Sequence, residues 1–320
     1  MSSPEVFSYR LDGLGKAAKE SSLKKNNEGL LWTHLDANHV NIKDSIKKFS
    51  DLDPIIVDAL IAAETRPRML QSHEGLLLIL RGVNLNEDSR PEDMVSIRLW
   101  IDSQQIISLR KFKLKAVQDI ESKLKLGNGP RDSGSFICML ISRLFERMQP
   151  VISELDEMTD EIEENLLESP DKNLRNQIIE IRKKSIMFRR YMSPQKDAIS
   201  QLLSSDVNFL TQEHKRQLQE SLNHITRYIE ELEAIRERAQ IVKDELSNIL
   251  AEKLNKNMYV LSIIGAIFLP LGFLTGLLGI NVGGIPGANY ENAFSIFLAI
   301  LFIIVFIQVF IFKNISGFKN

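Results

Sequence analysis

Two long apolar segments near the C-terminus constrain this chain more than any other feature. Between Lys256 and Lys313 the only formally charged residue is Glu291, although the 320-residue chain carries 40 basic and 42 acidic residues. The runs from Met258 to Leu278 and from Ala293 to Phe312 each match the roughly 20 apolar residues that a helix needs to cross about 30 Å of hydrocarbon. A buried hairpin in a soluble protein is the alternative, but the second run is apolar on all sides, unlike an ordinary soluble helix. We therefore expect the lipid bilayer as a partner.

Lysines indicate how these segments are oriented. They flank the pair of segments and are absent from the connection between them; the flanking residues are Lys253, Lys256, Lys313 and Lys319. Because Lys and Arg are enriched in cytoplasmic loops, we expect both termini on the cytoplasmic side of an inner or plasma membrane. Membrane helices over residues 257–279 and 293–312 would then enclose an outer loop, residues 280–292, and precede a cytoplasmic tail, residues 313–320.

Residues 1–130 alternate between strand-like and helix-like patterns. Predicted strands are rich in Leu, Ile, Val or Trp and bounded by polar turns: Leu31 to Leu35, Gly75 to Val83, Met94 to Ile101 and Gln105 to Arg110. Helical patterns occupy Ile42 to Phe49, Pro54 to Ala63 and Leu114 to Lys125. The alternation predicts a cytoplasmic α/β domain.

Residues 131–256 have a helical texture instead. The pattern predicts a hairpin of two helices, Phe136 to Ser169 with an interruption at Pro150, and Lys172 to Leu203. Neither glycine nor proline occurs between Gln195 and Ile264, so nothing obliges the next helix to end before the membrane. We predict one continuous helix from about Thr211 to Gly279, a stalk that becomes the first membrane span.

An almost heptad stripe follows the stalk. Its apolar residues are spaced by three and four: Leu218, Leu222, Ile225, Ile229, Leu232, Ile235, Ala239, Val242, Leu246 and Ile249. A helix this long needs partners along its length, and two spans per chain enclose no pore. Both points favour a homo-oligomer if the protein conducts ions.

The sequence lacks the common catalytic motifs and the usual spacing of metal ligands. The sequence has no P-loop, no H-E-x-x-H and no nucleophile elbow, so we expect neither an enzyme nor a resident cofactor, and no nucleic-acid partner. Cys138 is the single cysteine, which excludes an internal disulfide. The five histidines include no pair spaced by three or four residues, so none sets two zinc ligands on one helical face.

The tripeptide Gly279-Ile280-Asn281 directly follows the first apolar segment, and the run VGGIPG continues to Gly287. Gly followed by Asn is also a common way to end a helix. At the end of the penultimate of two C-terminal spans, after a long uninterrupted helix, it resembles the signature of the CorA superfamily of divalent-cation transporters. Thr65 to Arg68, EGLLLILRGVNLN, MVSIRLW and Arg189-Arg190 with Pro194 extend the resemblance over the whole chain, and favour the zinc-associated ZntB branch.

The resemblance implies a funnel-shaped homopentamer in which the tripeptide closes the outer mouth. Gly279 would end the pore helix, and Asn281 would face the cation and contact its hydration shell through the amide oxygen. Neutral oxygens suit this role because they hydrogen-bond bound water without stripping it from the ion. The glycine-rich run Gly283 to Gly287 replaces the acidic and aromatic residues common near the motif in magnesium transporters, and so favours zinc.

Alignment on the tripeptide also places further residues along the pore: Asn255, Met258, Leu261, Leu269, Gly272 and Gly276. The resemblance makes Met258 and Leu261 gate candidates near the cytoplasmic end, since apolar constrictions block ions by dewetting. The alternative for the glycines is close helix packing through small residues.

Three functions remain open from the sequence. The first is zinc transport through a pentameric pore. The second is a magnesium, cobalt or nickel channel of the CorA type, and the third is a two-span oligomeric sensor or scaffold that conducts nothing.

Overall fold

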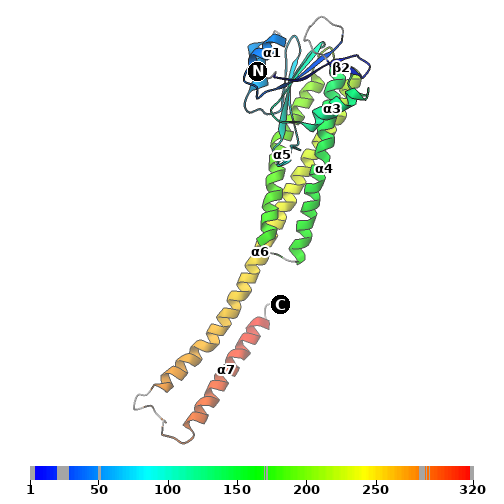
Figure 1. The fold of residues 1–320 in the computed structure, drawn as a ribbon. Helices are drawn as coiled ribbons and strands as arrows, with labels where there is room; N and C mark the ends of the chain where they lie inside the picture. Colours follow the sequence, from blue (N-terminus) through cyan, green and yellow to red (C-terminus); the bar gives the residue numbers. More distant parts are fainter. Residues whose placement is uncertain are drawn as a thin grey trace. The chain divides into compact units, whose positions relative to one another are not determined.

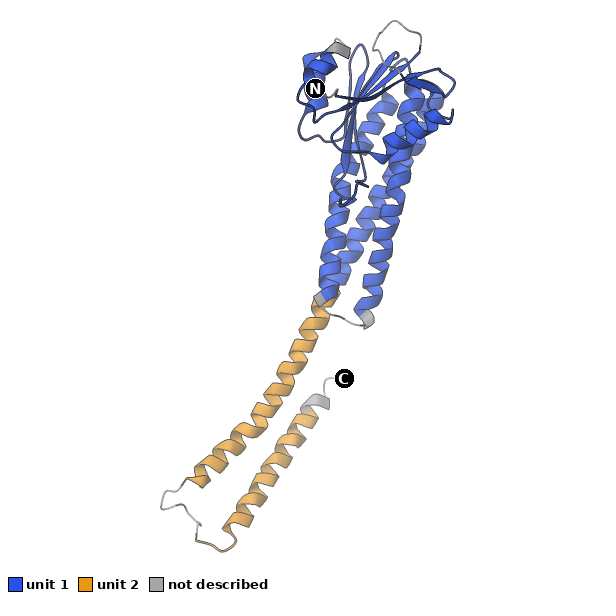
Figure 2. Ribbon diagram, viewed as in Figure 1, with its two compact units in different colours: residues 1–243 blue, residues 244–320 orange. Residues whose placement is uncertain are grey.

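The computed structural model describes residues 4–19, 29–49, 52–168, 170, 172–280, 285, 287 and 289–317. They form two compact units, residues 1–243 and 244–320 (Figure 2). The first unit contains a sheet and a helical hairpin, and the second contains the two apolar helices.

A seven-stranded sheet forms the N-terminal part of the first unit, in the order β2-β1-β3-β7-β6-β5-β4 (Figure 1). Its strands are β1 (Glu5–Leu11), β2 (Ala17–Lys19), β3 (Leu31–Asp36), β4 (Arg68–Gln71), β5 (Leu76–Gly82), β6 (Val95–Ile101) and β7 (Gln105–Arg110). Only the β3–β7 pair is parallel among the strand pairs of the described residues. The α/β character predicted for this region is confirmed.

Four strands match their predictions closely, whereas β1, β2 and β4 are missing from the sequence prediction. β2 and β4 are short strands at the two edges of the sheet, and their three and four residues are too few to show an alternating apolar pattern. β1 does carry a signal, because Phe7, Tyr9 and Leu11 alternate with polar residues; this period of two is typical of a half-buried strand.

Helices cover both faces of the sheet. α1 (Ile42–Phe49) and α2 (Pro54–Ile61) share a buried cluster with Leu77 and Ile79 of β5, while α4 (Ser133–Glu168) and α5 (Lys172–Ser204) contact β5. Because both faces are covered, β5 is apolar throughout its LLLIL run instead of alternating. α2 begins where Asp53 accepts a hydrogen bond from the Ile55 amide, with proline in the first turn.

The helices α4, α5 and α6 (Gln212–Gly279) lie side by side in the first unit (Figure 1). The sequence predicts an interruption at Pro150, and this prediction is wrong: α4 continues through Pro150. Proline removes one backbone hydrogen bond, but Met148, Ile152 and Leu155 on either side of it are buried. Packing of this continuous stripe holds the helix together across the missing bond.

Most of the apolar stripe of α6 is buried within the chain between Leu218 and Val242, and Leu222 and Ile229 are half-buried. Tyr228 of α6 packs edge-on against Phe145 of α4, with ring centroids 6.3 Å apart, and Arg189 of α5 forms an ion pair of 2.9 Å with Glu233 of α6. The stripe therefore has its partners in α4 and α5 of the same chain, and this part of it is no evidence for self-association.

The remaining helices are α3 (Lys115–Lys125), which follows the sheet, and α7 (Ala293–Gly317), which follows α6. α6 begins within one residue of its predicted start and ends at Gly279, as predicted. The predicted continuous helix is therefore confirmed, and α7 extends five residues beyond the predicted end of the second apolar segment.

Candidate functional site

The second unit pairs the C-terminal part of α6 with α7. Half-buried residues recur on one face of α6 at Ile263, Ile267, Leu271 and Leu274, and on α7 at Phe297, Leu301, Ile304, Val305 and Gln308. The Gln308 side-chain amide donates a hydrogen bond to the Ala266 carbonyl, at 3.3 Å. These residues form the contact between the two helices, both of which are long and apolar enough to span a membrane.

The predicted pore residues lie on the other side of α6. With about 3.6 residues per turn, Asn255, Met258, Leu261, Leu269, Gly272 and Gly276 all project to the half of the helix opposite Ile263, Ile267, Leu271 and Leu274. Met258, Leu261 and Leu269 are 65%, 70% and 75% exposed. The structure thus collects the predicted set on one face of α6 that α7 does not cover.

The glycines on this helix lack any close neighbour. A Cβ atom added at Gly265, Gly272, Gly276 or Gly279 would meet nothing within 4 Å. Gly272 borders an apolar groove of about 440 Å³ that is also lined by Thr275 and by residues of α7. Close packing through these glycines, the alternative for the pattern, is therefore not realised between α6 and α7.

The tripeptide stands at the end of α6. Gly279 is the last helical residue and Ile280 is half exposed. Asn281, together with Gly283 and Gly284, lies outside the residues that the structure describes, so its predicted contact with the cation stays a prediction.

Polar groups within the spans are few and use backbone partners. The Thr275 hydroxyl donates to the Leu271 carbonyl at 2.8 Å, which satisfies it in an apolar medium. The sequence prediction missed the contact of Gln308 with Ala266. A single amide in an apolar helix is a signal for such a contact, since amide side chains tend to hydrogen-bond across helices. Glu291 precedes α7 and is exposed.

Metal ligands are not gathered in this structure. Within the described ranges, no group of three or more His, Cys, Asp or Glu side chains could hold a metal ion. His34 is fully buried beneath the sheet surface and its Nδ1 lies 2.7 Å from the Ser108 hydroxyl. Burial lowers the pKa of His34 to about 3, so this ring stays neutral at physiological pH.

Comparison with known proteins shows the family to which this chain belongs. The family model described as CorA-like Mg2+ transporter protein matches residues 27–314. The chain belongs to this CorA-like family. The match covers the α/β domain from β3 onward, α4, α5, the long helix α6 and α7 as far as residue 314.

Individual relatives cover nearly the whole chain. The zinc transport protein ZntB of Yersinia enterocolitica is 32% identical over 95% of this chain and 93% of its own length. The divalent cation transporter CmaX of Pseudomonas aeruginosa is 38% identical, over 90% and 89% respectively. A solved structure of full-length CmaX superimposes with a TM-score of 0.85 at 35% identity and covers 99% of both chains. The CorA-like fold is therefore shown for the full length of the described chain.

Proposed function

We propose that this member of the CorA-like family transports divalent cations, with zinc as its cargo, through a pore walled by copies of α6. One observation carries the proposal: the face of α6 with Met258, Leu261, Leu269 and Gly276 is exposed and turned away from α7. This face also carries Gly265, Gly272 and Gly276, and a helix that served only as an anchor would have no need of a glycine-lined face. Several copies that bring this face together would enclose a narrow path.

The chemistry of this path is that of a hydrated ion. No titratable side chain lies between Tyr259 and Tyr290, so the wall offers apolar side chains, glycines and backbone oxygens. At the outer mouth, Gly279, Ile280 and Asn281 would supply a ring of amide and carbonyl oxygens that hold the cation's water shell. Met258 and Leu261 would narrow the cytoplasmic end, where an apolar constriction stops ions by dewetting.

Zinc is favoured by two features, and both rest on the likeness to ZntB. The similarity to ZntB extends over 95% of this chain, and the glycine-rich run after the tripeptide lacks acidic residues. CmaX is described only as a divalent cation transporter, and the family model is described as a Mg2+ transporter. Magnesium, cobalt and nickel are therefore the competing cargoes. A test that resolves the metals therefore has to accompany any test of transport.

Assembly and orientation complete the proposal. Residues 1–130 and 131–256 would lie in the cytoplasm, residues 257–279 and 293–312 would cross the inner or plasma membrane, and residues 280–292 would form the outer loop. A homopentamer with the α6 helices around one axis is the expected state. Mass measurement of the purified chain in mild detergent tests this, and a monomer or dimer would contradict it.

Uptake by proteoliposomes under imposed voltage and pH gradients tests the function itself. We expect uptake of zinc that exceeds uptake of magnesium, cobalt and nickel, with a driving force of about 2.3 kcal/mol per charge per 100 mV. Preferential uptake of magnesium would show that magnesium, and not zinc, is the cargo. Absence of flux for every metal would favour the sensor or scaffold instead.

The variant Asn281→Ala tests the outer mouth. It should abolish or strongly reduce uptake without dissociating the oligomer, because it removes a ring of amide oxygens and no core packing. Asn289→Ala is the matched control, since Asn289 is an exposed asparagine of the same connection outside the tripeptide. Equal uptake by both variants would refute the assigned role of Asn281.

A further inference from the structure

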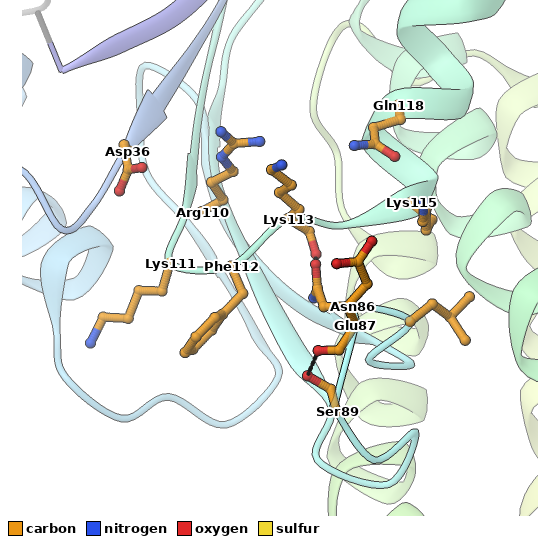
Figure 3. A pocket seen from close by; sticks show the side chains of 11 residues that line it. Asp36, Asn86, Glu87, Ser89, Arg110, Lys111, Phe112, Lys113, Lys115 and Gln118 are labelled. Carbon is orange, nitrogen blue, oxygen red and sulfur yellow. Dashed lines mark hydrogen bonds between the residues drawn. The ribbon is translucent and has the colours of Figure 1, made fainter.

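A basic pocket lies where the sheet passes into α3 (Figure 3). It has a volume of about 660 Å³ and is lined by the end of β7, the connection to α3, the first turn of α3 and the loop after β5. This volume is within the range of roughly 300 to 1,000 Å³ that is typical of small-molecule sites. The pocket belongs to the first unit and has no part in the proposed cation path.

Cations outnumber anions around this pocket. Arg110, Lys111, Lys113 and Lys115 line it together with two carboxylates, Asp36 and Glu87. The Lys111 ammonium donates to the Ala63 carbonyl at 2.8 Å, and Figure 3 shows it extending away from Arg110 and Lys113.

Three cations of the pocket lack a counter-ion. In the part of the chain that the structure describes, no carboxylate lies within 4.0 Å of the charged nitrogens of Arg110, Lys113 or Lys115. Figure 3 shows the Lys113 side chain extending toward Arg110. Cations held together without partners favour an anionic ligand.

The N-terminus of α3 adds to the same potential. Leu114 is the N-cap residue and offers no side-chain hydrogen bond. The amides of Val117 and Gln118 donate to its carbonyl, so those of Lys115 and Ala116 are left for another acceptor. The first turn of a helix also carries a partial positive charge. Lys115 and Gln118 of this turn line the pocket, which places the helix end at the unpaired cations.

Hydrogen bonds hold the walls of the pocket in place. The Asn86 amide donates to the Lys113 carbonyl at 3.0 Å and to the Asn84 side chain at 2.7 Å. The Asn38 amide donates to the Lys111 carbonyl at 2.7 Å. These contacts tie the connection between β7 and α3 to two other loops, so the cationic residues project from a preformed frame.

An exposed aromatic ring also lines the pocket, and it points away from the charged groups of Arg110 and Lys113 (Figure 3). Phe112 lines the pocket and is 63% exposed. Exposed aromatic side chains stack on the planar bases of nucleotides, and this stacking contributes about 1–3 kcal/mol per base. Phosphate-binding cations beside a free aromatic ring are the two elements that recognise a nucleoside phosphate.

We propose that this pocket binds a nucleoside di- or triphosphate. Arg110, Lys113, Lys115 and the first amides of α3 hold the phosphate chain, and Phe112 stacks on the base. Glu87 opposes the phosphates and limits the affinity. The site adds a metabolite-binding function to the cytoplasmic domain, independent of cation transport.

Titration of the purified full-length chain with ATP in metal-free buffer tests the proposal, because this measurement does not depend on transport. We expect saturable binding that Lys113→Glu weakens at least about tenfold and that Glu87→Gln strengthens severalfold. Lys47→Glu is the matched control: Lys47 is an exposed lysine on α1 outside the pocket, and its replacement should leave binding unchanged. Failure of ATP to saturate, or equal loss in both lysine variants, would overturn the site.

Inorganic tripolyphosphate separates the phosphate chain from the nucleoside. It should bind more weakly than ATP, and Phe112→Ala should weaken ATP binding without changing tripolyphosphate binding. Equal affinity for the two ligands together with a silent Phe112→Ala would overturn the nucleoside assignment.

Discussion

Arg238 of α6 connects three carboxylates of α4, and its replacement should loosen the helical part of the first unit. Its guanidinium binds both oxygens of Glu163, at 2.8 and 2.7 Å, contacts Asp156 at 3.0 Å and also bonds to Asp160. These hydrogen bonds, with Glu163 first, raise the pKa of Arg238. The fork geometry is one that lysine cannot reproduce.

The magnitude follows from the exposure of the partners. The Arg238 side chain is 32% exposed, and those of Asp156, Asp160 and Glu163 are 55%, 60% and 40% exposed. Ion pairs this accessible to water contribute about 0.2–1 kcal/mol each. Three pairs together contribute about 1–2 kcal/mol, and Arg238→Met in addition leaves three carboxylates facing one another.

Cys138 supplies the assay. It is the single cysteine, it is 4% exposed on α4, and burial raises the pKa of its thiol to about 12. A thiol reagent therefore labels it only after the helices open. In moderate urea, where global unfolding controls labelling, Arg238→Met should speed labelling of the full-length chain about 5- to 30-fold.

Two controls, high salt and a second arginine variant, test whether the effect of Arg238→Met comes from its ion pairs or from the loss of any arginine. The effect of Arg238→Met should shrink in 1 M salt, where the screening length is about 3 Å. Arg227→Met is the control, because Arg227 is 54% exposed and its contacts lie within its own helix: an ion pair with Glu231 at 3.4 Å and the Tyr228 ring at 5.6 Å. Equal labelling rates for Arg238→Met and Arg227→Met would refute the tether between α4 and α6.

Three further outcomes are expected. Replacing Met258 or Leu261 by serine should make the pore wetter and raise basal flux, whereas Ile296→Ser on the exposed surface of α7 should not; unchanged flux in both pore variants would move the gate elsewhere. Glu291→Gln should change the pH dependence of uptake only modestly and leave transport intact, and loss of all proton dependence with flux preserved would make Glu291 the coupling site. Between pH of about 6.5 and 5, His34 binds a proton in the unfolded chain but not in the folded one. Lowering the pH from 7 to 5 should therefore reduce the free energy of unfolding by about 2 kcal/mol, and His34→Gln should remove this pH dependence. The same pH dependence in His34→Gln would disprove the role of His34.

Local patterns in the sequence were sufficient for the long elements. The charge-free runs predicted both apolar helices, and the absence of glycine and proline predicted a helix that continues to Gly279, because hydrophobic length and helix-breaking residues act on the segment that contains them. The tripeptide and the alignment along α6 predicted a set of residues, and the structure shows that this set shares one face of the helix. Its role in conduction remains a prediction.

Pairing between distant segments needed the tertiary structure. The stripe on α6 is apolar whichever helix covers it, so periodicity could not show that α4 and α5 of the same chain do so. A proline such as Pro150 gives the same local sequence signal whether the helix breaks there or packing keeps it continuous, so the sequence alone could not distinguish the two. The basic pocket joins Asp36, loop 84–91 and the start of α3, because strand order brings them together. Sequence periods record which face of an element avoids water, whereas the neighbour of that face is selected by the fit of surfaces far apart in the chain.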